Sequence, residues 1–142
     1  MGTYASQADL VGRHGEQRLI EVTAHTTAVA GTIDADAVAA AIDDAESTLS
    51  TYLRIRYTLP LTSWPKALTR SVVDMAWYYL RSPYADEGET KAYNDAMRWA
   101  RDIGEGKADL VDAAGADAPS STGSIQVAGP TKVFSRETLR RM

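Results

Sequence analysis

The run YLRIRYTLPL at residues 52–61 is the feature that most constrains how this chain folds. Its apolar residues continue a helical stripe from the preceding segment. Pro60 then biases Leu59 away from helical geometry, so we expect a long amphipathic helix to end here. The triplet Ser-Trp-Pro at residues 63–65 opens a second helix, since proline is tolerated in a first turn. The run suits a helical packing module and supplies no chemistry, so we predict a small helical domain that binds other proteins.

Asp34 and Asp36 are predicted to begin the long helix, because carboxylates suit the free N–H groups and the dipole of a helix start. Residues spaced by three and four give it one apolar face. This face comprises Val38, Ile42, Ala45, Leu49, Leu53 and Tyr57. The other side is predicted to carry Asp43, Asp44, Glu46, Ser47, Ser50 and Thr51. Adjacent carboxylates on a helix do not converge, so Asp43 and Asp44 indicate a solvated face.

The remaining helices follow from caps and breaks. Ser6 caps a short helix over residues 6–13, and residues 16–22 form one or two further turns after Gly15. Low helix propensity predicts a loop over residues 23–33. A helix over residues 63–81 and one from Asp86 to Gly104 or Gly106 complete the body. Their inner faces are predicted to be Leu68, Val72, Met75, Ala76, Tyr79 and Leu80, then Tyr93, Met97, Ala100 and Ile103. The fold class is therefore all-α, a small bundle of about four helices.

The amino-acid composition of the chain changes after Lys107. We predict a helical domain over residues 1–112 and a flexible linker over residues 113–124, which consists of Ala, Gly, Asp, Pro, Ser and Thr. An extended C-terminal arm follows over residues 125–142. Short β segments around residues 129–130 and a last helical turn are compatible with its pattern.

Charge is unevenly distributed along the chain, whose formal net charge is −4. Residues 119–142 contain four cations and one anion, a charge of +3, so residues 1–118 carry −7. An acidic body is a poor non-specific ligand for nucleic acid. The basic tail is predicted to dock on a neighbouring copy or a partner. The alternative is that it is only a solubilised terminus.

Motifs for catalysis or cofactor binding do not emerge. His14 and His25 are not at metal-ligand spacing and are predicted to be ordinary surface or cap residues. G-x-S-x-G and Gly-rich phosphate loops are absent, and a calcium loop around Gly31 fails on ligand count. We therefore predict no enzyme, no cofactor and no metal. The chain has no cysteine, which fits a reducing compartment, and neither a signal peptide nor a membrane span is expected.

Two arginines and a set of aromatic residues have ambiguous roles. Arg54 is predicted to be exposed, and Arg56 to bury its stem beside the apolar face. The aromatic residues fill the core or, in a second interpretation, include interface anchors, since Tyr, Trp and Arg dominate binding hot spots. This set is Tyr52, Tyr57, Trp64, Trp77, Tyr78, Tyr79, Tyr84 and Trp99.

Several motifs together carry a family resemblance over nearly the whole chain. The short helix ADLVGRHG at residues 8–15, the run at residues 52–61, Pro65 with Leu68, and FSRETLR at residues 134–140 occur in this order. In this the chain resembles small proteins of Mu-like tailed phages and prophages. Relatives often carry an acidic, Gly-containing loop before the Asp-led helix, where this chain has Ala and Thr.

The resemblance implies a structural head–tail connector, or adaptor, in the phage neck. Such proteins form a ring, commonly of twelve copies, beneath the portal, contact a downstream neck or tail-completion protein, and let DNA pass through the lumen. Location in the virion, after the host cytoplasm, follows. The C-terminal arm is implied to contact the portal or a neighbouring copy, and we predict docking through Lys132, Phe134, Arg136, Leu139, Arg140 and Arg141.

Two other functions stay open from the residues. One is a small helical adaptor or regulator that binds a single partner as a monomer or dimer. The other is a DNA-binding packaging accessory, which the acidic body disfavours.

Overall fold

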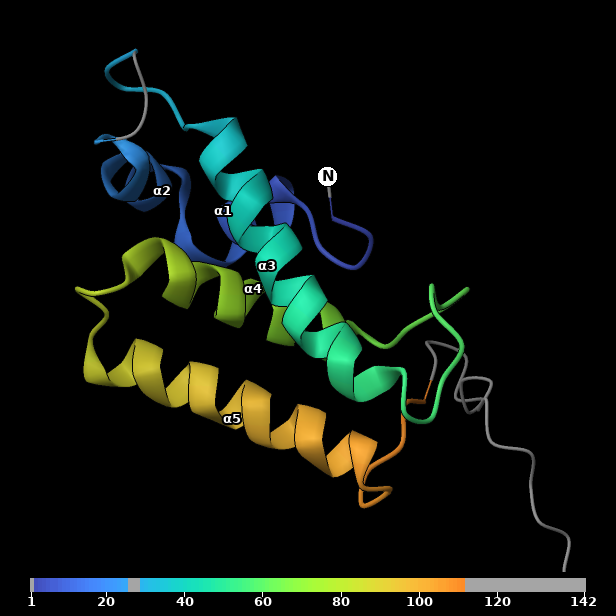
Figure 1. The fold of residues 1–142 in the computed structure, drawn as a ribbon. Helices are drawn as coiled ribbons and strands as arrows, with labels where there is room; N and C mark the ends of the chain where they lie inside the picture. The colour runs from blue at the N-terminus through green and yellow to red at the C-terminus, as the bar shows by residue number, and fades with distance from the viewer. Residues whose placement is uncertain (1, 26–28, 112–142) are drawn as a thin grey trace, which may run out of the picture.

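The computed structural model describes residues 2–25 and 29–111, which form five α-helices and contain no strand (Figure 1). The all-α prediction is confirmed. The helices number five because Gly15, at φ +90°, separates the first two turns from the next two. The bounds are α1 Gln7–His14, α2 Glu16–Thr23, α3 Ala35–Leu53, α4 Lys66–Arg81 and α5 Glu87–Gly104.

Helix α4 is the centre of the fold, since it packs against all four other helices. It lies between α3 and α5, and α1 and α2 cover one end of this three-helix layer (Figure 1). The predicted inner residues of α3 up to Leu53 are buried, as are Leu68, Val72 and Met75 of α4. The sequence periodicity therefore assigns the core face of α3 correctly and that of α4 in part, since the predicted Tyr79 and Leu80 are only half-buried.

The long helix is shorter than expected. Asp34 caps α3 as predicted, accepting the backbone N–H groups of Asp36 and Ala37. The prediction that α3 continues to Tyr57 is wrong, because the helix ends at Leu53. Beyond this point, Arg56 donates to the carbonyls of Ile103 and Ala108. These bonds tie the segment after α3 to the end of α5 and to the segment that follows it, well before Pro60 is reached.

The start of α4 also differs from the expectation. The helix begins at Lys66 and Pro65 is its N-cap, so the predicted start at Ser63 is three residues early. Trp64 precedes a proline and is therefore disfavoured in helical geometry. Its ring instead meets the Tyr4 ring edge to face, with centroids 5.1 Å apart.

The body packs as far as Leu110, which is fully buried. The backbone N–H of Leu110 donates to the Tyr57 hydroxyl over 3.0 Å, and Asp109 pairs with Arg56 at 2.6 Å. These contacts hold the segment after α5 against the end of α3. The predicted linker at residues 113–124 and the predicted arm at residues 125–142 lie outside the described residues.

Candidate protein-binding surfaces

All six residues predicted to dock on a partner lie outside the described part of the chain. They are Lys132, Phe134, Arg136, Leu139, Arg140 and Arg141. Candidate binding surfaces are therefore sought on the helical body. Two side-chain clusters hold its elements together, and the faces outside these clusters remain exposed.

One cluster fastens the N-terminal segment to α3 through Glu46. Its carboxylate accepts the backbone N–H groups of Thr3 at 2.8 Å, Tyr4 at 2.6 Å and Ala5 at 3.2 Å. The residue is 9% exposed, so these charge-assisted bonds replace the water that the carboxylate loses. The prediction that Glu46 lies on the solvated side of the helix is wrong. Glu46 instead anchors the N-terminal segment to α3, although the helical pattern alone assigns it to the polar side of the helix.

Tyr4 continues the same attachment toward α4. Its hydroxyl accepts the backbone N–H of Leu61 over 3.2 Å, and its carbonyl accepts the Thr69 hydroxyl over 2.8 Å. Gly2 lies so close to α3 that an added Cβ would collide with Ile42. The segment is thus bound at several points and forms part of the body.

A second cluster surrounds Trp77, whose side chain is buried. The indole N–H donates to Glu89 Oε1 over 2.8 Å, and Arg81 Nε donates to Glu89 Oε2 over 3.1 Å. Glu89 also closes the predicted capping box with Asp86. Burial raises the pKa of Glu89, but the hydrogen bonds from Trp77, the Asp86 backbone and Arg81 outweigh it and hold the pKa below its ordinary value. The carboxylate therefore stays ionised and ties α4 to α5.

His14 lies on the Trp77 ring, with centroids 4.0 Å apart and planes 7° from parallel. Its Nε2 is buried without a hydrogen-bond partner, and burial, then the Arg13 charge, lowers the pKa of the imidazole. The prediction of an ordinary surface or cap histidine is only partly right for His14, which does end α1 but whose half-buried ring packs α1 against α4. It holds for His25, which is exposed.

Ion pairs surround this stack and join it to α1 and α2. Arg13 forms a fork on Asp74 of α4, at 2.7 and 3.3 Å, and Arg18 lies 5.3 Å from the Trp77 ring centroid. The cluster has a small recess of about 230 Å³. Its two arginines, Arg13 and Arg18, face the three carboxylates of Asp74, Asp86 and Glu89, so the recess offers no excess of positive charge to an anionic ligand.

The aromatic residues divide between core and surface. Tyr57 and Trp77 are core residues, and Tyr84 is 81% exposed. Tyr78, Tyr79 and Tyr93 form a half-buried tyrosine face along α4 and α5, in which Tyr78 and Tyr93 stack at 4.3 Å. Burial and then a hydrogen bond with Tyr79 raise the pKa of Tyr93 to about 12, so its hydroxyl is neutral at ordinary pH. Rigid half-exposed rings of this kind are typical of binding surfaces.

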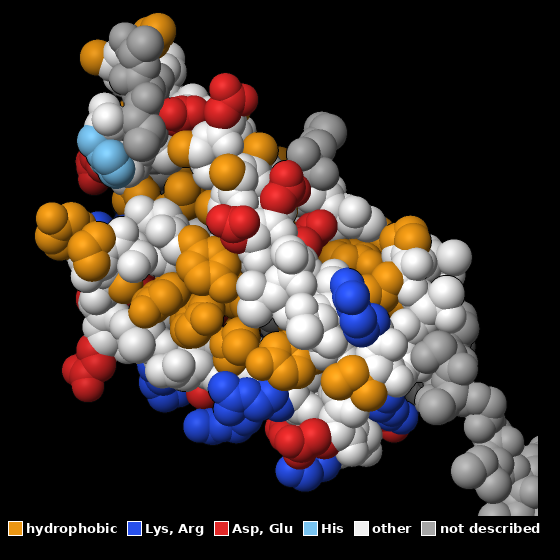
Figure 2. All heavy atoms as spheres, viewed as in Figure 1, with side chains coloured by type: hydrophobic (Ala, Val, Ile, Leu, Met, Phe, Trp, Pro, Cys, Tyr) orange, Lys and Arg blue, Asp and Glu red, His pale blue; other side chains and the backbone are white. Residues whose placement is uncertain are grey.

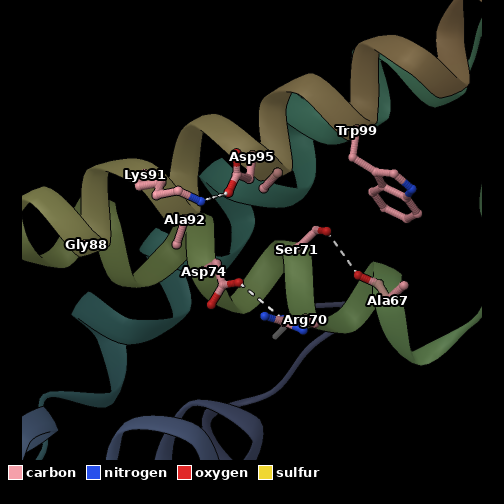
Figure 3. A pocket seen from close by; sticks show the side chains of 10 residues that line it. Ala67, Arg70, Ser71, Asp74, Gly88, Lys91, Ala92, Asp95 and Trp99 are labelled. Carbon is pink, nitrogen blue, oxygen red and sulfur yellow. Dashed lines mark hydrogen bonds and ion pairs between the residues drawn. The ribbon is translucent and has the colours of Figure 1, made fainter.

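A groove of about 390 Å³ lies between α4 and α5 (Figure 3). Small side chains form its floor, and the Trp99 ring stands at one end. Its charged residues pair along their own helices, Lys91 with Asp95 at 2.8 Å and Arg70 with Asp74 at 3.7 Å. The groove is therefore electrically balanced. Its lining comprises Ala67, Arg70, Ser71, Asp74, Gly88, Lys91, Ala92, Asp95, Ala96 and Trp99.

A second groove, of about 310 Å³, lies beside the first half of α3 and is called here the α3 groove. Its floor is apolar, and Asp36 stands at its edge. On the other side it is bounded by the fastened N-terminal segment and the start of α1. It is lined by Gly2, Ser6, Gln7, Ala35, Asp36, Val38, Ala39 and Ile42.

The described residues were also compared with the requirements of a metal site and of a membrane span. Within residues 2–25 and 29–111, no group of three or more His, Asp or Glu side chains is placed to hold a metal ion. No helix in this part of the chain is long and apolar enough to cross a membrane.

Sequence reasoning misses the two clusters for a shared reason. Glu46 is a carboxylate that helical periodicity assigns to the polar side of α3, and His14 precedes a glycine at a helix end, so each has the local pattern of a surface residue. Their partners are distant in sequence: Tyr4 for Glu46, and Trp77 for His14. For Glu89 a partial signal existed, since the capping-box spacing from Asp86 predicts one of its bonds.

Comparison with known proteins places these features in a family. Residues 4–128 match the family described as Bacteriophage Mu, Gp36. Gene product J of Escherichia phage Mu is 36% identical over 135 residues, which cover 94% of this chain and 95% of that protein. The Mu-like prophage FluMu protein gp36 of Haemophilus influenzae is 29% identical over 110 residues, covering 78% of this chain and 77% of that protein.

Proposed function

This chain belongs to the Gp36 family of phage Mu and Mu-like prophages, and on that premise we propose that it is a structural head–tail connector. Copies assemble as a ring, commonly of twelve in this type of protein, beneath the portal of a tailed phage. The ring joins the DNA-filled head to a downstream neck or tail-completion protein. DNA passes through its lumen, and the protein ends in the virion neck.

The observation that carries this proposal is how the body uses its buried and half-buried polar groups. Glu46, Glu89 and Arg56 each hold one element to another. A body whose polar groups are committed in this way is rigid, as a subunit needs when it transmits load between two larger assemblies. Its open faces, the tyrosine face and the two grooves, are then available for contacts with neighbours.

The C-terminal segment supplies the second part of the proposal. Residues 131–142 combine Phe134 and Leu139 with Lys132, Arg136, Arg140 and Arg141. Apolar anchors among cations suit an apolar site with an acidic rim. We assign this segment to attachment, while the helical body forms the ring.

The mass of the full-length protein, measured with and without purified portal, tests the function. A connector gives a ring-sized assembly on the portal and sediments with it. A mass of one or two subunits that portal leaves unchanged contradicts the proposal and favours the small adaptor or regulator instead. Binding to DNA that falls steeply with added salt favours the packaging accessory.

A further inference from the structure

The tyrosine face is the middle of a larger apolar surface that reaches from α5 across to α3 and is called here the α3–α5 surface. We propose that two copies of the free protein pair through this surface about a two-fold axis. The pair is a contact of the free protein, so it goes beyond the proposed connector function, which concerns the ring on the portal. The apolar members of the surface are Tyr52, Ile55, Tyr78, Tyr79, Tyr93 and Met97.

Contacts between side chains hold the middle of the surface together across three helices. Tyr93 of α5 lies against Tyr78 and Tyr79 of α4, with ring centroids 4.3 and 5.8 Å apart. The Tyr79 hydroxyl is in turn 3.3 Å from the Thr48 hydroxyl of α3. Rings that are already held in this way lose little freedom when a second surface covers them.

The surface continues without a gap to the last turns of α3 and α5. Gly104 of α5 lies so close to α3 that an added Cβ would be 3.3 Å from Ile55 Cδ1 and 3.4 Å from the Tyr52 carbonyl oxygen. Ile55 is 57% exposed, and the half-buried Met97 lies one turn beyond Tyr93 on the same side of α5. A continuous exposed apolar surface of this kind marks a site of protein association.

The two borders of the surface carry opposite charge. Exposed Asp44 lies one turn before Thr48 on α3, and residues 19–53 contain six Asp or Glu residues and no Lys or Arg. Exposed Arg101 lies one turn after Met97 on α5. Figure 2 shows hydrophobic side chains in the middle of this face, acidic ones above them over α3, and mainly Lys and Arg below them. The apolar middle therefore has an acidic side and a basic side.

This order of charges is complementary to itself, which identifies a second copy as the partner. A two-fold axis that lies in the plane of the contact, between α3 and α5, sets α3 of each copy over α5 of the other. Asp44 of each copy then faces Arg101 of the other, and the tyrosines meet in the middle. An arrangement with α3 over α3 would bring the two acidic borders together and is disfavoured. An aromatic centre with a charged rim is also the usual anatomy of a protein interface.

Sedimentation equilibrium of the full-length protein without portal measures the pairing. We expect a mass of two subunits for the native chain. Asp44→Lys and Arg101→Glu each put two like-charge contacts into the pair, one on each side of the axis, and should raise its Kd at least ~tenfold. Glu16→Lys and Lys66→Glu are the matched controls, because they make the same charge changes at exposed positions outside the surface. Circular dichroism confirms that each variant is folded.

A mixture of Asp44→Lys and Arg101→Glu distinguishes a two-fold pair from a head-to-tail contact. In a mixed pair both contacts between positions 44 and 101 join opposite charges, so pairing should recover and stop at two subunits. A head-to-tail contact would alternate the two variants and grow beyond two. Growth beyond two, or no recovery in the mixture, overturns the proposal. Equal masses for the native chain, the two variants and the controls overturn the assignment to this surface.

Addition of purified portal separates this proposal from the connector function. Native protein that is a single subunit when free at ~0.1 mM but forms a ring-sized assembly on the portal overturns the pair and leaves the connector function standing. Native protein that pairs when free but never sediments with portal supports the pair and contradicts the connector function.

Discussion

Trp77 of α4 donates its indole N–H to Glu89 of α5 over 2.8 Å, and this bond joins the centre of the fold to its outer helix. The same carboxylate accepts Arg81 and closes the cap of α5. One side chain therefore serves a helix start, a helix–helix contact and a buried tryptophan.

Replacing Glu89 by alanine should destabilise the protein. The change leaves the buried Trp77 N–H without its acceptor, and such a loss costs about 1–3 kcal/mol. Urea denaturation measures the free energy of unfolding. Glu87→Ala is the matched control, because Glu87 is an exposed carboxylate in the same first turn. Equal losses at the two positions would show that the cap charge matters and the tryptophan bond does not.

Stability should fall in mild acid because of His14. Its pKa is lowered in the folded state, so the unfolded chain binds the proton more readily. The contribution of the neutral stacked ring is fully present above the ordinary pKa of about 6.5 and is lost progressively as the pH falls below that value and through the lowered pKa of the folded state. Phenylalanine keeps a flat ring on Trp77 and does not titrate. His14→Phe should therefore flatten the change in unfolding free energy between about pH 7 and pH 5.

His25→Asn provides the comparison for the acid prediction, since His25 is an exposed histidine outside the Trp77 cluster. If the native chain and His14→Phe lose stability in parallel over this range, then carboxylates and not His14 control the acid response.

Leu53 and its neighbour Arg54 should differ sharply in their tolerance of alanine. Leu53 is fully buried at the last turn of α3, so Leu53→Ala should cost roughly 2–5 kcal/mol of unfolding free energy. Arg54 is exposed, and Arg54→Ala should change it by no more than ~0.5 kcal/mol. Chemical denaturation of the two variants compares them, and similar costs would refute the placement of α3 against the core.

The helical body should fold without the residues that follow it. A chain that ends at Asp112 keeps Leu110 and the pair between Arg56 and Asp109, so it should retain helical circular dichroism and melt cooperatively. A chain that ends at Lys107 loses the buried leucine and should melt at a lower temperature. Identical melting of the two truncated forms would place the end of the domain before Leu110.

Deleting residues 131–142 should abolish attachment to the portal and leave the helical body folded. The deleted segment holds the apolar anchors Phe134 and Leu139 with their neighbouring cations. Co-sedimentation with purified portal or DNA-filled heads gives the readout, and circular dichroism confirms that the body is intact. Undiminished sedimentation of the truncated protein would transfer attachment to the tyrosine face of α4 and α5.

Local signals predicted most of the fold. Apolar spacing gave the buried face of α3 and part of that of α4, and the caps at Asp34 and Asp86 gave two helix starts within a residue or two. Where the chain departs from local preference, the cause is distant in sequence. Helix α3 ends at Leu53, and the Arg56 side chain beyond it binds the carbonyls of Ile103 and Ala108, which the periodicity around Pro60 does not predict.

The candidate surfaces could be predicted from the sequence only in part. Residue type predicts that some of the aromatic side chains named in the sequence analysis reach the surface. Only the packing of the helices decides that Tyr84 is exposed while Tyr57 and Trp77 are buried. The α3 groove depends on the close approach of Gly2 to α3, a contact across 40 residues. Charge segregation is the part of that site that the sequence does display, because acidic and basic residues separate along the chain itself.

The attachment of the N-terminal segment has a consequence for synthesis in the cell. Tyr4 leaves the ribosome before the residues that hold it, since Glu46, Leu61 and Thr69 follow 42, 57 and 65 positions later. The earliest residues of the body therefore wait until α4 has emerged before they reach their final place. Nascent chains from which Thr69 has not yet emerged should leave this segment open to protease, and longer ones should protect it, so its protection marks the moment at which α3 and α4 hold it in place.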